Sequence, residues 1–436
     1  MSLIADLNAR GLIQDIMPGT EAQLAKEMTT GYAGFDPTAD SLHVGNLLPI
    51  TLLMRFQKAG HKPVALLGGA TGMIGDPSGK SAERNLLDMA TIGRNISAQR
   101  AQLEKFLDFD PAAANAAELV NNYDWFRDFS FLEFIRTAGK HITVNYMMSK
   151  DSVQKRLETG LSFTEFTYQL IQGYDYYWLN LHKGVKLQLG GADQWGNIVT
   201  GTELIRRMNA ANAGDGVHEV SPAREAFAFT CPLITKSDGG KFGKTESGTV
   251  WLDPARTSPY KFYQYWLNLG DEDAAKMMYT FSFREVPEIN ALIAQHQEAP
   301  HQRMLQKALA EELTTLVHSK EDLEFAQQAA DILFSNKAID ALKALNEQQL
   351  LEVMDGVPQV RFTAGEDFDL LTFLADEKVF PSKSEAKKMI AAGGFSINKG
   401  KVTDTAWKPQ PAHLLNGKYL LLQKGKKDYT LGVLTA

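Results

Sequence analysis

The sequence predicts an α/β protein in which a parallel, helix-covered sheet is followed by a helical segment and a small α+β unit. Residues 30 to about 230 alternate β-rich runs, at 63–67 and 185–189, with amphipathic stretches at 47–59 and 162–172. This alternation is typical of strands joined by covering helices in a parallel sheet. The fold class therefore follows from the order of the patterns, before any motif is considered.

A ligand crevice is expected at the carboxyl ends of the predicted strands, as in other parallel sheets. Gly-rich segments follow two of these strands directly, at 68–72 and 190–193. Glycine allows the backbone to approach a ligand closely. These segments therefore mark the candidate ligand-binding edge of the sheet.

The length of 436 residues predicts about three domains, each able to bury its own core. Residues 254 to about 345 have helical periodicity, and prolines at 259, 287 and 300 mark helix boundaries. The predicted segments are a sheet domain at 1–235 with an insertion near 125–160, a mobile loop at 236–253, a helical domain at 254–345, a linker at 346–367 and a small α+β domain at 368–436.

Composition excludes several classes of protein. Hydrophobic residues make up 44% of the chain and charged residues 22%, which is ordinary for a soluble globular protein. No apolar run approaches the roughly twenty residues of a membrane span, and the N-terminus lacks a signal-peptide core, so we expect a cytoplasmic protein. The single cysteine, Cys231, excludes an internal disulfide and a Cys-based zinc cluster. Without an HExxH motif either, we expect no tightly bound metal or organic cofactor, and Mg²⁺ should arrive with a nucleotide.

Charge is distributed unevenly along the chain. The formal net charge is −7, yet residues 380–436 carry ten Lys against three acidic residues and have a net charge of +7. A basic module on an acidic body is typical of a protein that binds a phosphate backbone. A solvated charged surface is the alternative. The candidate RNA contacts are Lys383, Lys387 and Lys388 on one predicted helix, and Lys424, Lys426 and Lys427 near the end of the chain.

Two short peptides about two hundred residues apart carry the residues best suited to chemistry. The first signature, PTADSLHVGN at 37–46, follows a short apolar strand and opens a helix, so its N–H groups and imidazole can face a polyphosphate. The second signature, KFGKT at 241–245, is a Gly-containing loop with two ammonium groups three residues apart. Such a loop can close on phosphates whose charge rises during nucleotidyl transfer. Together they predict an ATP-activating site.

Six peptides in a fixed order point to a family. They are PTADSLHVGN, GGATGMIGDPSGK, NNYDW, SFTEFTYQLIQGYD, QLGGADQWGN and KFGKT. They closely resemble the peptides of bacterial tyrosyl-tRNA synthetases, which are class I aminoacyl-tRNA synthetases, and the match covers nearly the whole chain. The resemblance implies a Rossmann-like catalytic domain, a helical anticodon-binding domain and a C-terminal S4-like RNA-binding domain, assembled as a homodimer.

The implied reaction has two steps. The carboxylate of L-tyrosine attacks the α-phosphate of ATP to give tyrosyl-adenylate and pyrophosphate, and the tyrosyl group then passes to the terminal ribose of tRNA(Tyr). No protein nucleophile is needed, so catalysis should come from positioning and electrostatic stabilisation. By resemblance, the catalytic residues are Thr38, His43 and Asn46 in the first signature, Lys80 and Arg84 as a second mobile basic pair, and Lys241, Lys244 and Thr245 in the second signature.

Two positions depart from the general class pattern. The first signature commonly ends in His, whereas this chain has Asn46. A side-chain amide can donate from about the position of an imidazole N–H, so ribose binding should survive. The second signature is KFGKT instead of the form with Met-Ser at its centre. The KFGKT form occurs among tyrosyl-tRNA synthetases, so it narrows the resemblance from class I synthetases in general to the tyrosyl enzymes.

A buried polar reader should separate tyrosine from phenylalanine, because the two differ by one hydroxyl. When phenylalanine binds, the protein groups that would hydrogen-bond that hydroxyl are left without a partner. This costs about 5.5–7 kcal/mol, or a factor of roughly 10⁴–10⁵ in the rate with phenylalanine relative to tyrosine, a magnitude already known for this enzyme family. By resemblance, the tyrosine-binding residues are Tyr32 and Asp175 at the phenol, Asp76, Tyr168 and Gln172 at the α-ammonium, and Asn122 and Gln194 nearby. The ATP-binding residues are Asp36, Gly45, Gly190, Asp193 and Lys244.

Some of these roles have plainer alternatives. Tyr168, Gln172 and Asp175 are spaced i, i+4 and i+7, so they share one helix face, but a polar face can also be a solvated surface. Asp193 could instead only cap the following helix. His43 could be a surface histidine that caps a helix, and the loop lysines could be solvated.

The insertion is unusually apolar over residues 131–148. Its apolar residues include Ile135, Ile142, Val144, Met147 and Met148. The resembling family uses the corresponding region at its dimer interface. Ordinary core packing is the alternative, because apolar residues are usually just buried.

Competing functions are a catalytically silent RNA-binding paralogue of the same architecture and a tryptophan-specific synthetase. The first is disfavoured because His43 and both loop lysines are present. The second is disfavoured because indole offers only a donor, whereas the Tyr32 and Asp175 pair suits a phenol. A phosphate-binding P-loop is excluded at 75–81, since only three residues separate its glycines where four are required. No G-x-S-x-G elbow of an α/β hydrolase occurs.

Overall fold

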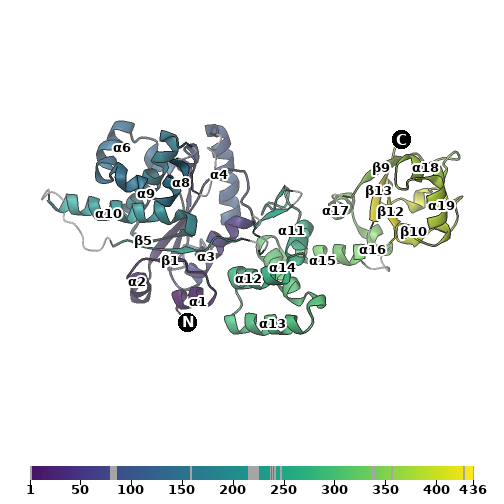
Figure 1. Cartoon of the computed structure of the whole chain (residues 1–436), viewed down its shortest axis with the longest axis horizontal. Helices are drawn as coiled ribbons and strands as arrows, with labels where there is room; N and C mark the ends of the chain where they lie inside the picture. The colour runs from purple at the N-terminus through teal and green to yellow at the C-terminus, as the bar shows by residue number, and fades with distance from the viewer. Residues whose placement is uncertain are drawn as a thin grey trace. The chain divides into compact units, whose positions relative to one another are not determined.

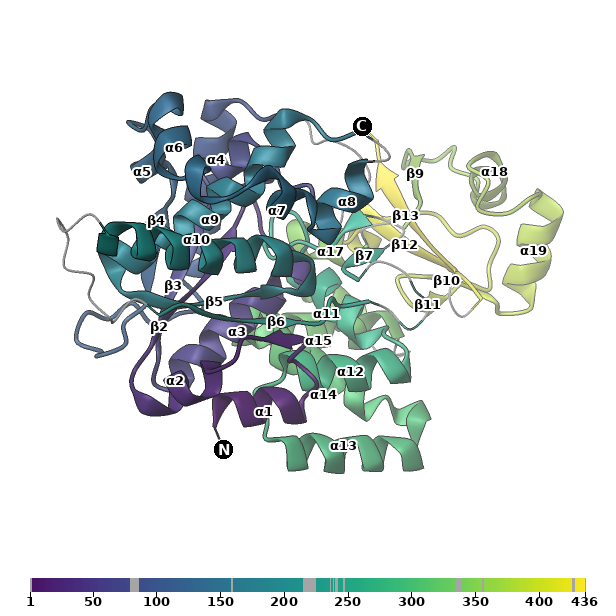
Figure 2. The ribbon, with the colours of Figure 1, turned by 60° about the vertical axis from the view of Figure 1, so that its left-hand side comes forward.

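The computed structural model describes residues 2–78, 86–157, 160–214, 225–235, 237, 239, 242–245, 248–334, 339–354, 357–425 and 428–435. The chain divides into two compact units. The first comprises Met1–Thr257 and Gln264–His318, and the second comprises Ser258–Tyr263 and Ser319–Ala436. Figures 1 and 2 show the ribbon from two directions.

A six-stranded sheet in the order β1-β6-β5-β2-β3-β4 forms the centre of the first unit. Strands β6, β5, β2, β3 and β4 are parallel, and β1 pairs antiparallel with β6. The predicted parallel sheet is therefore confirmed. The strands of this unit are β1 (Asp15–Ile16), β2 (Thr30–Phe35), β3 (Lys62–Leu67), β4 (Glu118–Asn121), β5 (Val185–Gly191) and β6 (Phe227–Cys231), with a separate ribbon of β7 (Lys244–Thr245) and β8 (Gly248–Thr249).

The order of connections reverses at β2. The chain continues from β2 to β3 and β4 on one side, whereas β5 and β6 lie on the other side. Tyr32 on β2 is the register partner of Val64 on β3 and of Gln188 on β5. In open α/β sheets, ligands bind outside the carboxyl ends of the strands at such a point. The fold therefore opens a crevice beyond Phe35 and Gly191, where β2 and β5 end.

Helices cover the sheet. Both views show α9 and α10 on one face and α2 and α3 on the other (Figures 1 and 2). The helices around this sheet are α1 (Leu3–Ala9), α2 (Thr20–Lys26), α3 (Leu47–Lys58), α4 (Met89–Leu103), α5 (Tyr123–Phe126), α6 (Phe131–Thr137), α7 (Val144–Met148), α8 (Asp151–Leu157), α9 (Phe163–Lys183) and α10 (Trp195–Gly214), with the short turns η1 (Val44–Asn46), η2 (Thr71–Met73), η3 (Gly139–His141) and η4 (Ala192–Gln194).

The longest of these helices, α9, has clear start and stop signals. Ser162 caps its first turn by accepting a hydrogen bond from the Glu165 N–H group (3.2 Å), and Gly184 ends it in the left-handed conformation. In the middle, Gly173 of α9 faces Gly201 of α10, and a Cβ atom on Gly173 would lie 3.4 Å from the Gly201 nitrogen. The two glycines let these helices pack backbone to backbone, so the polar side chains of α9 are held rigidly over the sheet.

The insertion contains both buried and exposed apolar residues. Ile142 and Met147 are each only 5% exposed and belong to the core, so the core-packing alternative holds for them. Ile135, Val144 and Met148 are 43%, 58% and 40% exposed. Phe131 and Leu132 of α6 are also exposed. The range 131–148 therefore contains both core residues and exposed apolar residues.

Helices also complete the first unit after the second signature. Helices α12, α13 and α14 pack on one another, and α12 also contacts α3 of the sheet domain. The packed face is apolar, with Met277, Phe281, Leu309 and Leu313 fully buried. The helices of this segment are α12 (Asp271–Phe281), α13 (Val286–Glu298) and α14 (Met304–Val317), with η5 (Pro300–Gln302) between the last two. Helix α11 (Pro259–Leu267) is divided between the units, with Pro259–Tyr263 in the second and Gln264–Leu267 in the first.

The second unit is a small α+β domain preceded by helices. Its five-stranded sheet has the order β11-β10-β12-β13-β9, and Phe380, Ile390 and Phe395 lie in its core. Its elements are α15 (Lys320–Phe334), α16 (Ile339–Ala344), α17 (Glu347–Val353), β9 (Gln359–Phe362), α18 (Leu370–Asp376), α19 (Lys383–Ala391), β10 (Phe395–Ile397), β11 (Gly400–Lys401), η6 (Pro411–His413), β12 (Tyr419–Lys424) and β13 (Asp428–Leu434).

Residues 346–367, which the sequence suggested as a linker, contain α17 and β9. Strand β9 pairs parallel with β13 and turns Val360 and Phe362 into the core of the second unit. The Glu347 carboxylate on α17 accepts hydrogen bonds from Lys418 and Tyr419 of the same unit. A strand of four residues whose partner follows about seventy residues later leaves little local signal, so only the folded structure reveals this pairing.

No helix within the described parts of the chain is both long enough and apolar enough to cross a membrane.

Candidate active site

A cavity of about 570 Å³ opens at the carboxyl ends of β2 and β5, where the topology places a ligand site. Residues from β2, η1, α9, β5 and η4 line it together. The predicted site residues that line the cavity are Tyr32, Asp36, Thr38, His43, Gly45, Asn46, Asp76, Tyr168, Gln172, Asp175, Gly190, Asp193 and Gln194.

His43 sits at the start of the helix that follows the first signature. It is the N-cap of η1, and its Nδ1 atom accepts a hydrogen bond from the Gly45 N–H group (3.0 Å). The Asn46 side-chain oxygen in turn accepts from the His43 N–H group (3.0 Å), which completes a capping box. Because Nδ1 is an acceptor, the proton of the neutral imidazole lies on Nε2. The capping role and the lining of the cavity are therefore compatible.

The backbone joins the two signatures, although they are about two hundred residues apart. The Val44 N–H group donates to the Val250 carbonyl (3.0 Å), and the Leu252 N–H group donates to the Leu42 carbonyl (2.9 Å). The Val250 N–H group donates to the Gly243 carbonyl (3.0 Å), so the stretch 250–252 bridges the signatures. Any shift of this stretch acts on both of them.

The second signature is anchored at its centre. The Phe242 ring contacts the rings of Tyr265, Trp266 and Phe281, with centroids 5.8–6.0 Å apart. Gly243 has a φ angle of +78°, which strongly favours glycine, and its N–H group donates to the Tyr265 hydroxyl (3.1 Å). Phe242 also lines the cavity. The aromatic anchor thus holds the signature backbone beside the site.

Several predicted basic residues lie outside the described residues, namely Lys80, Arg84, Lys241, Lys426 and Lys427. The backbone of Lys244 and Thr245 forms β7.

Asp175 is a carboxyl group held deep in the cavity wall. It is 1% exposed, and it accepts hydrogen bonds from Asn122 Nδ2 (3.0 Å) and Trp125 Nε1 (2.9 Å). Burial raises the pKa of Asp175 to about 8, and the negative charge of Asp36 adds to the rise, whereas the two donors oppose it. Tyr32 is equally buried, and its hydroxyl has no hydrogen-bond partner among the described residues. A ligand hydroxyl between these two groups would satisfy both.

Asn122 does not line the cavity. It is fully buried, and its side-chain oxygen accepts from the Ala70 N–H group (2.6 Å) while its nitrogen donates to Thr71 (3.1 Å) and Asp175. It therefore orients the Asp175 carboxyl and the Gly-rich segment after β3, and it does so from behind the cavity wall.

The remaining acidic groups form a connected polar wall. Asp36 accepts from the Tyr168 hydroxyl (2.9 Å) and from Thr71 Oγ1 (2.8 Å). Asp76 accepts from Gln194 Nε2 (2.7 Å) and from the Ser78 N–H group (2.9 Å). These bonds orient the two carboxyl groups in a partly buried wall, where their free oxygen lone pairs could accept from a ligand ammonium group.

Asp193 and Gln172 complete this wall. Burial raises the pKa of Asp193, and the nearby Asp76 charge adds to that rise. Asn197 Nδ2 donates to the Gln172 side-chain oxygen (3.0 Å). The helix face that carries Tyr168, Gln172 and Asp175 is therefore turned into the cavity and is not a solvated surface.

Sequence reasoning did not identify every polar residue of this site. Thr71, Ser78 and Gln188 line the cavity, and Trp125 and Asn197 hold lining residues by hydrogen bonds. Gln188 is 3% exposed, and its side-chain oxygen has no partner within the described chain. Its position in an apolar strand was the available signal, because a buried glutamine in a parallel strand needs a partner.

A metal site of protein ligands does not emerge from the described residues: none of their His, Cys, Asp and Glu side chains form a group of three or more able to hold an ion.

The parallel sheet, the two joined signatures and the cavity define the chain as a class I tRNA synthetase. Residues 24–335 match the family of class I tRNA synthetases (W and Y), and residues 349–432 match the SYY-like C-terminal domain of tyrosine–tRNA ligase. A solved structure of a C-terminally truncated mitochondrial tyrosyl-tRNA synthetase from Aspergillus nidulans is 30% identical, with a TM-score of 0.66, and the match covers 76% of this chain and 94% of that one.

Full-length relatives narrow the assignment. The tyrosine–tRNA ligases of Bacteroides fragilis and Porphyromonas gingivalis are each 56% identical over 439 residues, and each match covers 99% of both chains. The chain belongs to the tyrosine–tRNA ligase family.

The raised pKa of Asp175 has a consequence for stability. The folded state binds this proton more tightly than the unfolded chain, in which the pKa is near 3.8. The stabilising contribution is therefore complete below about pH 4 and is lost as the pH rises toward about 8. Relative to Asp175→Asn, the wild type should lose up to about 1.4 kcal/mol of unfolding free energy per pH unit across that range.

Thermal unfolding midpoints of the two proteins, measured at several pH values, test this expectation. The difference between the midpoints should move steadily against the wild type as the pH rises. A difference that does not change with pH would mean that the Asp175 carboxyl titrates near its ordinary value.

Proposed function

We propose that the chain activates L-tyrosine with ATP and transfers the tyrosyl group to tRNA(Tyr) through the residues of the cavity described above. The observation that carries this assignment is one cavity lined both by the Tyr32 and Asp175 pair and by the first signature. Amino-acid selection and nucleotide chemistry can then occur in one continuous space. No observation favours the catalytically silent paralogue.

Tyr32 and Asp175 read the phenol of the substrate. The tyrosine hydroxyl donates to an oxygen of the Asp175 carboxyl group and accepts from the Tyr32 hydroxyl, which has no other partner among the described residues. Phenylalanine would leave the Tyr32 hydroxyl buried without a partner and would take from Asp175 the hydrogen bond of the substrate hydroxyl. Asn122 and Trp125 hold the carboxyl group still, so it cannot turn away when the wrong amino acid enters.

Asp76 and its neighbours hold the α-ammonium group of tyrosine. Asp76 is oriented by Gln194 and Ser78, and Gln172 is oriented by Asn197. Tyr168 is tied to Asp36, so the two form one unit next to the ammonium site. The substrate carboxylate is thereby directed toward the first signature, where the α-phosphate lies in the proposed complex.

Catalysis then rests on position and charge. The carboxylate is already ionised, so no general base is required for its attack on phosphorus. His43 donates from Nε2 to a phosphate oxygen, and Thr38 and the Asn46 amide donate nearby. Lys80, Arg84, Lys241, Lys244 and Thr245 are the proposed contacts to pyrophosphate. Asp36, Gly45, Gly190 and Asp193 face the nucleotide, and Mg²⁺ arrives with ATP instead of occupying a site of its own.

Two further proposals concern assembly and RNA. The exposed apolar residues of the insertion, namely Phe131, Leu132, Ile135, Val144 and Met148, form the proposed homodimer interface, because exposed apolar residues that gather in one segment are typical of subunit contacts. The lysines of the second unit are the proposed tRNA contacts, with Lys383, Lys387 and Lys388 exposed on α19. As an enzyme of translation that acts on tRNA, the protein is proposed to work in the cytoplasm.

The first test is amino-acid-dependent ATP–pyrophosphate exchange without tRNA. Tyrosine should support exchange and tryptophan should not, while phenylalanine should be disfavoured by roughly 10⁴–10⁵, the magnitude known for this family.

The Tyr32→Phe variant tests the contact to the substrate hydroxyl, because it removes one hydrogen-bond donor. It should lower kcat/KM for tyrosine roughly fivefold, which corresponds to about 1 kcal/mol, with no loss for phenylalanine. Equal losses for both substrates would show that Tyr32 does not read the hydroxyl.

The dimer proposal can be tested by charge insertion. Leu132 is 72% exposed, so Leu132→Asp should leave the fold intact and convert a dimer to a monomer on analytical ultracentrifugation. Met28→Asp is the matched control, since Met28 is another exposed apolar residue, 52% exposed, outside the insertion. If Leu132→Asp leaves the sedimentation of a dimer unchanged, the interface lies elsewhere.

The RNA proposal predicts a change in salt dependence. Replacement of Lys383, Lys387 and Lys388 together by Ala should weaken tRNA binding and reduce the salt slope by about one for each lysine that contacts a phosphate. Tyrosine-dependent exchange should not change, because Lys383, Lys387 and Lys388 do not line the cavity. Lys26→Ala is a control on the first unit, and a salt slope equal to that of the wild type would argue against α19.

A further inference from the structure

Helix α12 is the platform on which the approach to the second signature is built. The Asp273 carboxylate accepts from the Ser237 N–H group (2.8 Å), and Lys276 Nζ donates to the Thr235 carbonyl (3.1 Å). Phe281, the last residue of α12, stacks under Phe242 with ring centroids 6.0 Å apart. Thr235, Ser237 and Phe242 each contact this one helix.

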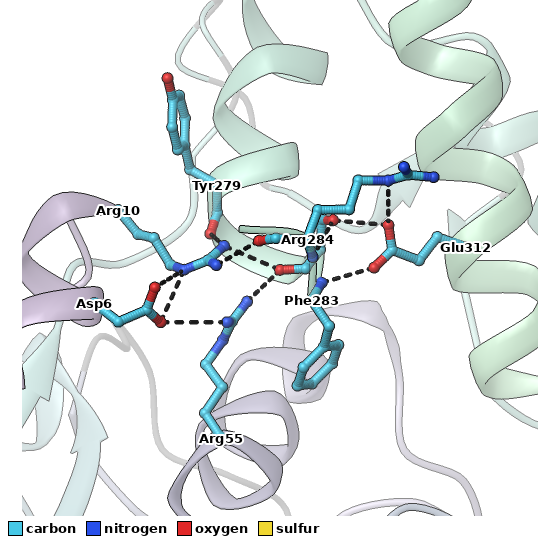
Figure 3. Close-up of polar contacts among 8 residues, drawn as sticks. Asp6, Arg10, Arg55, Tyr279, Phe283, Arg284 and Glu312 are labelled. Carbon is cyan, nitrogen blue, oxygen red and sulfur yellow. Dashed lines mark hydrogen bonds and ion pairs between the residues drawn. The ribbon is translucent and has the colours of Figure 1, made fainter. Parts of the chain in front are cut away.

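Two buried arginines hold the other side of this helix end. Arg10 Nη1 and Arg55 Nη2 both donate to the Ser282 carbonyl, at 3.0 and 2.5 Å, directly after Phe281. Arg10 also donates to the carbonyls of Tyr279 (3.4 Å) and Arg284 (2.6 Å). Figure 3 shows the two guanidinium groups converging on this helix end from α1 and α3. The contacts satisfy carbonyls that a helix terminus otherwise leaves without partners.

This clamp is electrostatically costly. Arg10 and Arg55 are only 7% and 6% exposed, and burial lowers the pKa of Arg55 to about 10, with the Arg10 charge adding to the effect. One carboxylate, that of Asp6, contacts both, at 2.8 and 3.6 Å. Arg55 Nε has no partner within the described chain. Two buried guanidinium groups on one carbonyl repel each other and lose their hydration, so they contribute little to the stability of the fold. A requirement to hold the end of α12 in a fixed position explains the pair better.

The clamp also connects the two signatures through α3. This helix begins directly after Asn46, and Arg55 lies near its other end. A helix of 12 residues is roughly 18 Å long and stiff. One end of α3 therefore carries the first signature, and the other end fixes the platform of the second.

We propose that Arg10 and Arg55 are positioning residues for nucleotide chemistry: they set the second signature relative to the first by fixing the end of α12. The inference rests on the proposed function for its kinetic consequence. Neither arginine lines the cavity, so neither touches substrate. The tyrosine subsite is built from β2, α9 and η4 without α12, so a loosened clamp should spare it.

The kinetic test separates tyrosine binding from adenylate formation. Arg55→Met keeps the length of the side chain and removes its donors and charge. The equilibrium dissociation constant for tyrosine should stay within about twofold of the wild type, while the single-turnover rate of adenylate formation at saturating ATP should fall about 10- to 100-fold. Arg55→Lys should recover part of that rate, because an ammonium group can still donate to the Ser282 carbonyl.

Arg284→Met is the matched control. The Arg284 side chain lies in the same cluster and pairs with Glu312 (3.4 Å), but only its backbone carbonyl takes part in the clamp. The Arg284→Met variant should form the adenylate at the wild-type rate. If Arg55→Met also keeps that rate, or if its tyrosine binding falls in proportion to its rate, the positioning role is refuted.

A second measurement does not depend on activity. Hydrogen exchange of peptides covering 232–245 should be faster in Arg55→Met and Arg10→Met than in the wild type and Arg284→Met, while peptides of α9 should be unchanged. Uniformly faster exchange would indicate general destabilisation and overturn the proposal, as would unchanged exchange at 232–245. If the wild type shows no tyrosine-dependent ATP–pyrophosphate exchange, the proposed function is refuted. The faster hydrogen exchange at 232–245 in the two arginine variants would still be expected in that case.

Discussion

The reversal of connections at β2 is the constraint on which the rest of the structure depends. Because β3 follows on one side and β5 lies on the other, nothing in the sheet covers the carboxyl end of β2. The first signature leaves β2 at that point, and the Gly-rich end of β5 lies beside it. The cavity, with the buried Tyr32 and Asp175 in its wall, and the first signature both occupy the space that this topology opens.

Within that space, burial sets the pKa values and the hydrogen-bonding needs of the polar groups. Asp175 would be an ordinary carboxylate in water, but the apolar core around α9 raises its pKa and makes any uncompensated partner costly. The same burial leaves the Tyr32 hydroxyl and the Gln188 amide oxygen without partners among the described residues. A site that stores unsatisfied polar groups is less stable than an apolar core of that shape, and it gains selectivity for a ligand that satisfies them.

Much of the site could be predicted from sequence because its motifs are local. The spacing of Tyr168, Gln172 and Asp175 placed them on one helix face. Whether that face was buried depended on the packing of α9 against α10 through Gly173 and Gly201, which no single segment encodes. Trp125 and Asn197 escaped notice because their roles are set by partners 50 and 25 residues away. The sequence suggested a linker at 346–367 for the same reason, since β9 is recognisable as a strand only from its pairing with β13.

The sequence by itself determined the fold class, the family resemblance and the chemical types gathered at the site, because periodicity and short motifs depend on neighbouring residues. Tertiary structure decided which apolar residues of the insertion are core and which are exposed, and it moved Asn122 behind the cavity wall. It alone brought Arg10 and Arg55 to the end of α12, across more than two hundred residues. Desolvation and long-range contacts exist only once the chain has closed on itself, so no local pattern can report them.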